Sequence, residues 1–199
     1  MKPLLAALVI LLFLAACSSE PAAAPDEVPG TATERTAPAT ASPSPAPTPP
    51  AEASPAANVL TLEGLGMLKI GQPVPAGSGW AERGAQISDE CRTVSSPDFP
   101  GVYAIVEGGK VRRVTVGERS DVKLVEGIGA GATEAEVRAA FPGFRETAHK
   151  YQDAPAKYLT APNAGGGDPA LRFEIGGDGK VSLMHVGTIP ALGYVEGCA

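Results

Sequence analysis

The sequence predicts an α+β fold made of two tandem units, each with a short helix and antiparallel strands. A short step occurs twice, as LKIGQP at residues 68–73 and as IGAGAT at residues 128–133. Two predicted hairpins, at residues 103–117 and 171–187, also match. The apolar residues that follow Lys110 and Lys180 have the same spacing from these lysines. The step glycines lie 60 residues apart and the lysines 70, which is longer than the periods of short solenoid repeats.

Composition limits both the core and the partners. Of the 199 residues 44% are hydrophobic but only 5% are aromatic, so the core must consist mainly of aliphatic side chains. The formal net charge is -6. An acidic chain lacks the basic surface that nucleic acids require, and we expect no nucleic-acid partner.

Residues 1–16 have the pattern of an export signal. Lys2 precedes an apolar run at residues 4–14, which is too short to span a membrane comfortably. The run ends in LAAC at residues 14–17, which resembles the lipobox of bacterial lipoproteins. The alternative is a plain signal peptide with a small-residue cleavage site.

The lipobox resemblance implies that the mature protein begins at Cys17 and carries a diacylglyceryl thioether and an acylated amine, with chains such as palmitate. Several acyl chains anchor a protein durably, whereas one chain is marginal. Ser18 follows the cysteine, where lipoproteins kept at the inner membrane often carry Asp. We therefore expect a lipid-anchored envelope protein, at the outer membrane and facing the periplasm if the cell has two membranes.

Residues 17–57 are predicted to form a disordered tether after the lipidated cysteine. Ala, Pro, Ser, Thr and Glu dominate residues 18–57, and no aromatic residue occurs there. Such a segment cannot bury enough apolar surface to offset its ordering entropy, and its prolines keep it extended. The folded domain is expected at residues 58–199, with repeats at about 58–120 and 121–199.

In the first repeat we expect strands at residues 59–65 and 87–94, the hairpin at 103–117, and a strand at 122–125. Its hairpin turns at Glu107-Gly108-Gly109, where glycines supply positive φ. The helical element after Gly71 is weakened to a short or irregular turn by two prolines and two glycines.

The second repeat contains the stronger helix signal. Thr133 and Glu136 form a capping box, three apolar residues share one face, and Pro142-Gly143 ends the helix. Strands are expected at residues 144–151 and 157–160, then a glycine-rich loop at 161–168, the second hairpin, and a last strand at 192–196.

This arrangement resembles the β-lactamase-inhibitory-protein fold, in which two helix-plus-sheet repeats form one curved sheet with a concave binding face. It is also similar to the small lipoprotein subunit of the outer-membrane β-barrel assembly machine, which has one such unit. The resemblance covers residues 60–198 and depends on the two glycine steps and the two hairpins. None of the inhibitory residues of that family can be matched to this sequence.

The cysteines predict a disulfide. With Cys17 lipidated, Cys91 and Cys198 form an even pair in an oxidising compartment. The alternatives are two buried free thiols, or a reactive Cys91 activated by His149 or His185. Metal sites need three or four clustered ligands, and the sequence shows no such spacing, so we expect neither a metal nor a cofactor.

The resulting hypothesis is a non-enzymatic binding module for a protein or a glycan of the cell envelope. The candidate binding face comprises the tryptophan and the four tyrosines: Trp80, Tyr103, Tyr151, Tyr158 and Tyr194. One alternative is a passive structural lipoprotein, and another is an enzyme that depends on Cys91 and a histidine.

Overall fold

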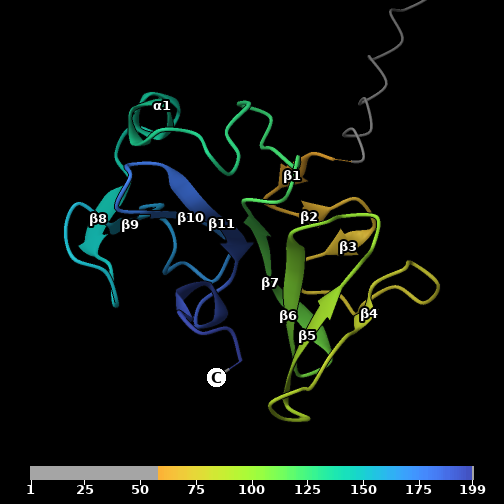
Figure 1. The fold of residues 1–199 in the computed structure, drawn as a ribbon. Helices are drawn as coiled ribbons and strands as arrows, with labels where there is room; N and C mark the ends of the chain where they lie inside the picture. The colour runs from red at the N-terminus through yellow and green to blue at the C-terminus, as the bar shows by residue number, and fades with distance from the viewer. Residues whose placement is uncertain (1–57, 199) are drawn as a thin grey trace, which may run out of the picture. The chain divides into compact units, whose positions relative to one another are not determined.

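An eight-stranded antiparallel sheet organises the computed structural model, which describes residues 58–198 (Figure 1). Its strand order is β4-β5-β6-β7-β11-β10-β9-β8. Two four-stranded meanders therefore meet at β7 and β11, which lie side by side at the centre. The strands are β4 (Ala81–Glu82), β5 (Cys91–Ser95), β6 (Val102–Glu107), β7 (Lys110–Gly117), β8 (Arg145–Ala148), β9 (Lys157–Thr160), β10 (Ala170–Ile175) and β11 (Val181–Gly187).

The prediction of an α+β fold with two helix-plus-sheet units is wrong. The described residues are mostly β, with a second sheet of three short strands and one α-helix, α1 (Glu134–Ala140). The short strands are β1 (Leu60–Thr61), β2 (Gly64–Leu65) and β3 (Leu68–Lys69). No helix follows the first glycine step, because the prolines there cannot donate to a helical ladder and Gly77 and Gly79 adopt positive φ.

Helix α1 begins and ends where the sequence predicts. The Thr133 side chain accepts a hydrogen bond from the Glu136 backbone, and the Glu136 side chain accepts one from the Thr133 backbone. This reciprocal pair satisfies two of the free amide groups at the helix start. Val137 on the inner face of the helix is buried.

The hydrophobic core lies against one face of the large sheet. The three-stranded sheet covers this face over the first meander and α1 covers it over the second. Leucines from the small sheet, Val137 of α1 and alternate residues of the long strands form one apolar cluster. The sheet members of that cluster include Val102, Ala104, Val114, Val116, Phe173, Met184 and Val186.

The two glycine steps contact the two hairpins in the same way. Gly71 and Gly131 both have positive φ, of 80° and 86°. Each donates its amide to a valine carbonyl at the start of a central strand, and each valine donates back to the residue after the glycine. The bonds are Gly71 N to Val111 O (2.7 Å), Val111 N to Gln72 O (2.9 Å), Gly131 N to Val181 O (2.8 Å) and Val181 N to Ala132 O (2.8 Å).

The two hairpins also share their register. In each hairpin the register shifts once, because one residue of the second strand is extra: Arg112 on β7, opposite Ile105 and Val106, and Ser182 on β11, opposite Glu174 and Ile175. Where β7 and β11 pair, Thr115 lies opposite His185. The neighbouring pairs are Val114 with Val186 and Val116 with Met184, so the ladder is nearly symmetric about this central pair.

Several predicted strands differ from those observed. Residues 122–125 contribute only an isolated bridge at Lys123, which pairs with Val59 and Gly129. The strand predicted at residues 192–196 is replaced by the 3₁₀ helix η1 (Ala191–Gly193), which follows Pro190. The segment at residues 59–65 is divided into β1 and β2 by a tight turn. The signal peptide predicted at residues 1–16 and the tether predicted at residues 17–57 lie outside the described residues.

Candidate functional site

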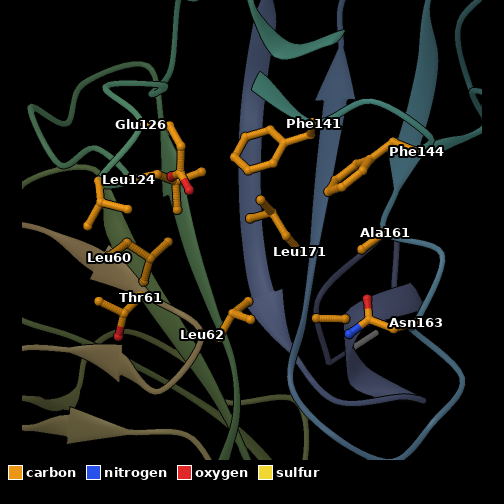
Figure 2. Close-up of a pocket in the computed structure, with 12 residues that line it drawn as sticks. Leu60, Thr61, Leu62, Leu124, Glu126, Phe141, Phe144, Ala161, Asn163 and Leu171 are labelled. Atoms are coloured by element: carbon orange, nitrogen blue, oxygen red, sulfur yellow. The ribbon is translucent and has the colours of Figure 1, made fainter. Parts of the chain in front are cut away.

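An apolar pocket lies on the core side of the sheet (Figure 2). It has a volume of about 290 Å³ and opens to solvent. Four separate parts of the chain form its walls: β1 and the turn after it, the loop before α1, the end of α1, and the loop from β9 into β10. Its lining residues are Leu60, Thr61, Leu62, Leu124, Val125, Glu126, Phe141, Phe144, Ala161, Asn163, Ala170 and Leu171.

Leucines and phenylalanines stand on opposite sides of this pocket. In Figure 2, Leu60 and Leu124 lie on one side and the rings of Phe141 and Phe144 on the other, with Leu171 between them. The two rings are 5.2 Å apart between centroids, and both pack on buried Phe173 at 5.7 and 6.0 Å. Because this aromatic cluster is anchored in the core, one wall of the pocket is preformed.

The rim of the pocket exposes large apolar side chains. Leu62 is 48% exposed and Val125 is 74% exposed, and both line the opening. A pocket of this size is about twice the 150 Å³ apolar cavity that can accommodate benzene, and lies near the lower end of ordinary ligand pockets. It can therefore hold one or two apolar groups and offers little chemistry for a charged ligand.

A chain of buried polar side chains occupies the opposite face of the sheet. Thr115 Oγ1 lies 3.0 Å from His185 Nδ1, and His185 Nε2 lies 3.2 Å from Glu174 Oε1. The other Glu174 oxygen lies 3.4 Å from His149 Nε2. Two backbone amides, those of Tyr151 and Gln152, donate to His149 Nδ1. That nitrogen is therefore an acceptor, and Nε2 carries the proton that is donated to Glu174.

Burial determines the charges in this chain. It lowers the pKa of His185 to about 4, and the hydrogen bond to Glu174 only partly opposes this effect. For Glu174 burial would raise the pKa, but hydrogen bonds from His185 and His149 outweigh it and the pKa is lowered. At neutral pH the Glu174 carboxylate thus carries its charge and the His185 imidazole beside it is neutral.

The order hydroxyl, imidazole and carboxylate is that of a nucleophile with its base and orienting acid. Here the hydroxyl is inaccessible, because Thr115 is 0% exposed and His185 is 2% exposed. A nucleophile has to reach a substrate, so this chain of contacts supports the structure of the sheet and does not form a catalytic site.

The disulfide prediction is confirmed. Cys91 and Cys198 are bonded, with a Cα–Cα distance of 5.5 Å across 107 residues of sequence. Cys91 is therefore not a free thiol, and the hypothesis of a Cys91 nucleophile loses its basis. Cys17 lies outside the described residues.

The five aromatic residues proposed as a binding face lie in different environments. Trp80 is buried and stacks on Phe99 at 5.6 Å, and Tyr158 is buried between His149 and Arg172. Tyr103 lines a groove on the polar face of the sheet, Tyr151 is exposed, and Tyr194 follows η1. Trp80 and Tyr158 thus act as core side chains.

Sequence reasoning missed both the pocket and the polar chain. The sequence analysis assigned no role to Glu174, although strand alternation places it and His185 on the face opposite Phe173 and Met184. The alternation could have identified that buried polar row. The pocket is formed by loops distant in sequence, and no periodic signal marks it.

Within residues 58–198 no three His, Cys, Asp or Glu side chains converge in a way that could hold a metal ion. The helices of this part of the chain include none long and apolar enough to cross a membrane. No protein-family model, curated protein or solved structure matches the chain significantly.

Proposed function

We propose that this chain is a lipid-anchored envelope lipoprotein that acts without catalysis, as a binding module for another protein of the cell envelope. The lipobox-like LAAC at residues 14–17 supports the anchor, and the Pro-rich composition of residues 18–57 supports a tether. The repeated glycine steps and hairpins support an internal duplication. The resemblance to the small lipoprotein of the β-barrel assembly machine stays a hypothesis.

One observation carries the binding role, namely the open apolar pocket with Leu62 and Val125 exposed at its rim. Burying apolar side chains on a partner removes this surface from water, at roughly 25 cal/mol for each Å². Apolar side chains seated in pockets are typical anchors of protein interfaces. The lining has little polar surface, so a protein side chain fits it better than a glycan does.

Photo-crosslinking in intact cells tests the proposal. A photoreactive amino acid replaces Val125 at the rim, and the matched control replaces Ile87, which is also exposed but does not line the pocket. We expect a discrete protein adduct from position 125 and none from position 87. A second substitution, Ala161→Leu, fills part of the pocket and should abolish the adduct while circular dichroism shows an intact fold.

Adducts that form equally from both positions would contradict a specific site, and so would adducts to lipid alone. Adducts that persist in Ala161→Leu would place the contact outside the pocket. In any of these cases the passive structural role becomes the better explanation.

A further inference from the structure

The C-terminal strap, residues 188–198, shows how a peptide segment lies on the polar face of the large sheet. It leaves β11, forms η1 against β7, β10 and β11, and ends at the disulfide to Cys91 on β5. The Thr188 amide donates to Arg112 O (3.0 Å). The buried Arg113 guanidinium donates to the carbonyls of Ala191 (2.9 Å) and Tyr194 (2.5 Å).

The opposite end of the same face has no such cover within the described residues. After β7 the chain turns back on itself, with Ser120 N donating to Gly117 O at 3.0 Å. The result is an open groove of about 800 Å³. Its floor includes Tyr103, Gly117 and Leu183, and its walls come from the β5–β6 loop, the turn after β7 and the loop after β8.

The groove and the surface beneath the strap occupy equivalent positions on the two hairpins, on either side of the central pair of Thr115 and His185. Tyr103 pairs with Thr115 on the first hairpin, as Arg172 pairs with His185 on the second. Across the central ladder, Leu183 pairs with Gly117 and Arg113 pairs with Gly187. The strap thus covers Arg113 and Arg172, whereas their counterparts, Leu183 and Tyr103, are half-buried and line the groove.

The side chains of the groove differ from those beneath the strap, and this difference indicates what the groove can bind. The strap lies over two guanidinium groups, of which that of Arg113 binds its backbone carbonyls, whereas a segment in the groove would meet an aliphatic side chain and a phenol ring. Glu118 and Arg119 stand exposed at the wall and form no ion pair with any described residue. The groove therefore combines the apolar side chains of Leu183 and Tyr103 with polar groups, which include Glu174 and Ser182 in its lining and both charges at its wall.

We propose that this groove binds a short peptide segment of a partner protein, with an apolar side chain seated over Leu183 and Tyr103. Glu118 and Arg119 then meet the polar groups that flank this anchor. A pocket that takes up one side chain of the bound segment is a recurring element of peptide recognition. The site lies on the face opposite the apolar pocket, so it does not depend on the function proposed for that pocket.

Peptide selection on the full-length chain in detergent tests the proposal. The probe is a phage-displayed library of random peptides, with a panel of cell-wall oligosaccharides as a second arm. We expect enriched peptides that share an apolar residue and bind wild type at least about tenfold more tightly than Ser182→Phe or Tyr103→Ala. Ser182 lines the groove, so the phenyl ring would occupy it.

Thr147→Phe is the matched control, because Thr147 is an exposed strand residue outside the groove. It should leave peptide binding unchanged. If Ser182→Phe does not fold, Arg119→Glu decides instead, since Arg119 is exposed and the substitution reverses the charge at the wall. The proposal is overturned if no peptides are enriched, if groove variants bind them as wild type does, or if only oligosaccharides bind in a groove-dependent way.

Discussion

Thr115 and His185 face each other across the two central strands, and Oγ1 of the threonine lies 3.0 Å from Nδ1 of the histidine. This pair is the point about which the ladder of β7 and β11 is nearly symmetric. The histidine continues the contact to Glu174 on the neighbouring strand. A buried polar row therefore crosses the junction between the two meanders, and its protonation is coupled to folding.

His185 should make the protein sensitive to mild acid. Its folded pKa is about 4, below the ordinary value of 6.5, so the unfolded chain takes up a proton first as the pH falls. Stability is therefore lost between about pH 6.5 and about pH 4, and this difference is worth roughly 3 kcal/mol. Urea unfolding at pH 7 and at pH 4 measures the loss directly.

The variant His185→Gln separates the contribution of His185 to the pH dependence of stability from the contribution of the acidic residues. It has no titrating group at position 185, so the fall in unfolding free energy over the same pH range should be smaller by about the His185 contribution. Glu174, whose pKa is lowered, loses its contribution only as the pH falls through its folded pKa. An equal pH dependence in wild type and variant would refute the assignment.

The Cys91–Cys198 bond should contribute substantially to stability. It closes a loop across 107 residues, and loop entropy for such a length predicts about 4.7 kcal/mol at most. We expect the double variant Cys91→Ser/Cys198→Ser to lose about 2–5 kcal/mol in urea unfolding. Wild type under reducing conditions is the control and should approach the variant, and no change on reduction would contradict the prediction.

Local signals in the sequence predicted much of the fold. The capping box of Thr133 and Glu136, the two hairpins and the disulfide each depend on short-range chemistry or on compartment. The fold class failed because the turn after Gly71, rich in proline and glycine, was grouped with a helical unit. In the first half of the domain the three-stranded sheet packs against the core, where a first helix was expected. Its strands have only two residues each, which is too short for an alternation of apolar and polar residues to reveal them.

The candidate site was harder to predict for a related reason. Leu60, Leu124, Phe141 and Ala161 approach one another only after four loops have been placed, so no spacing in the sequence marks the pocket. The five aromatic residues predicted to form a binding face share only their residue type, and the structure buries some of them and exposes others. Trp80 packs in the core, whereas Tyr151 is exposed.

Lipidation of Cys17 is the prediction on which the proposed location depends. Mass spectrometry of the protein extracted from cells should show an N-terminal peptide that begins at residue 17 and carries acyl chains. The variant Cys17→Ser should leave the membrane fraction, because several buried acyl chains provide the anchoring free energy. Cleavage elsewhere, or an unmodified residue 17, would contradict the prediction.

Gly187 and Gly117 end the two central strands, and they should tolerate alanine very differently. A Cβ at Gly187 would lie 2.4 Å from Arg112 O and 2.9 Å from Arg113 Cα, both backbone atoms, because Thr188 draws the strap close to Arg112. At Gly117 the nearest atoms are the Leu183 side chain at 3.2 Å and Gly101 O at 3.5 Å. The contact at Gly187 cannot be relieved by rotating a side chain, because its nearest atoms are backbone atoms. The contact at Gly117 can be relieved by a rotation of the Leu183 side chain.

We therefore expect Gly187→Ala to lower the unfolding free energy by about 1–3 kcal/mol, as overpacking against fixed atoms usually does. Hydrogen exchange should also rise in the strap, because the Thr188 amide loses its position against Arg112. Gly117→Ala is the matched control at the equivalent end position of β7 and should change stability by less than about 1 kcal/mol. Equal effects of the two substitutions would show that the strap does not hold Gly187 against β7.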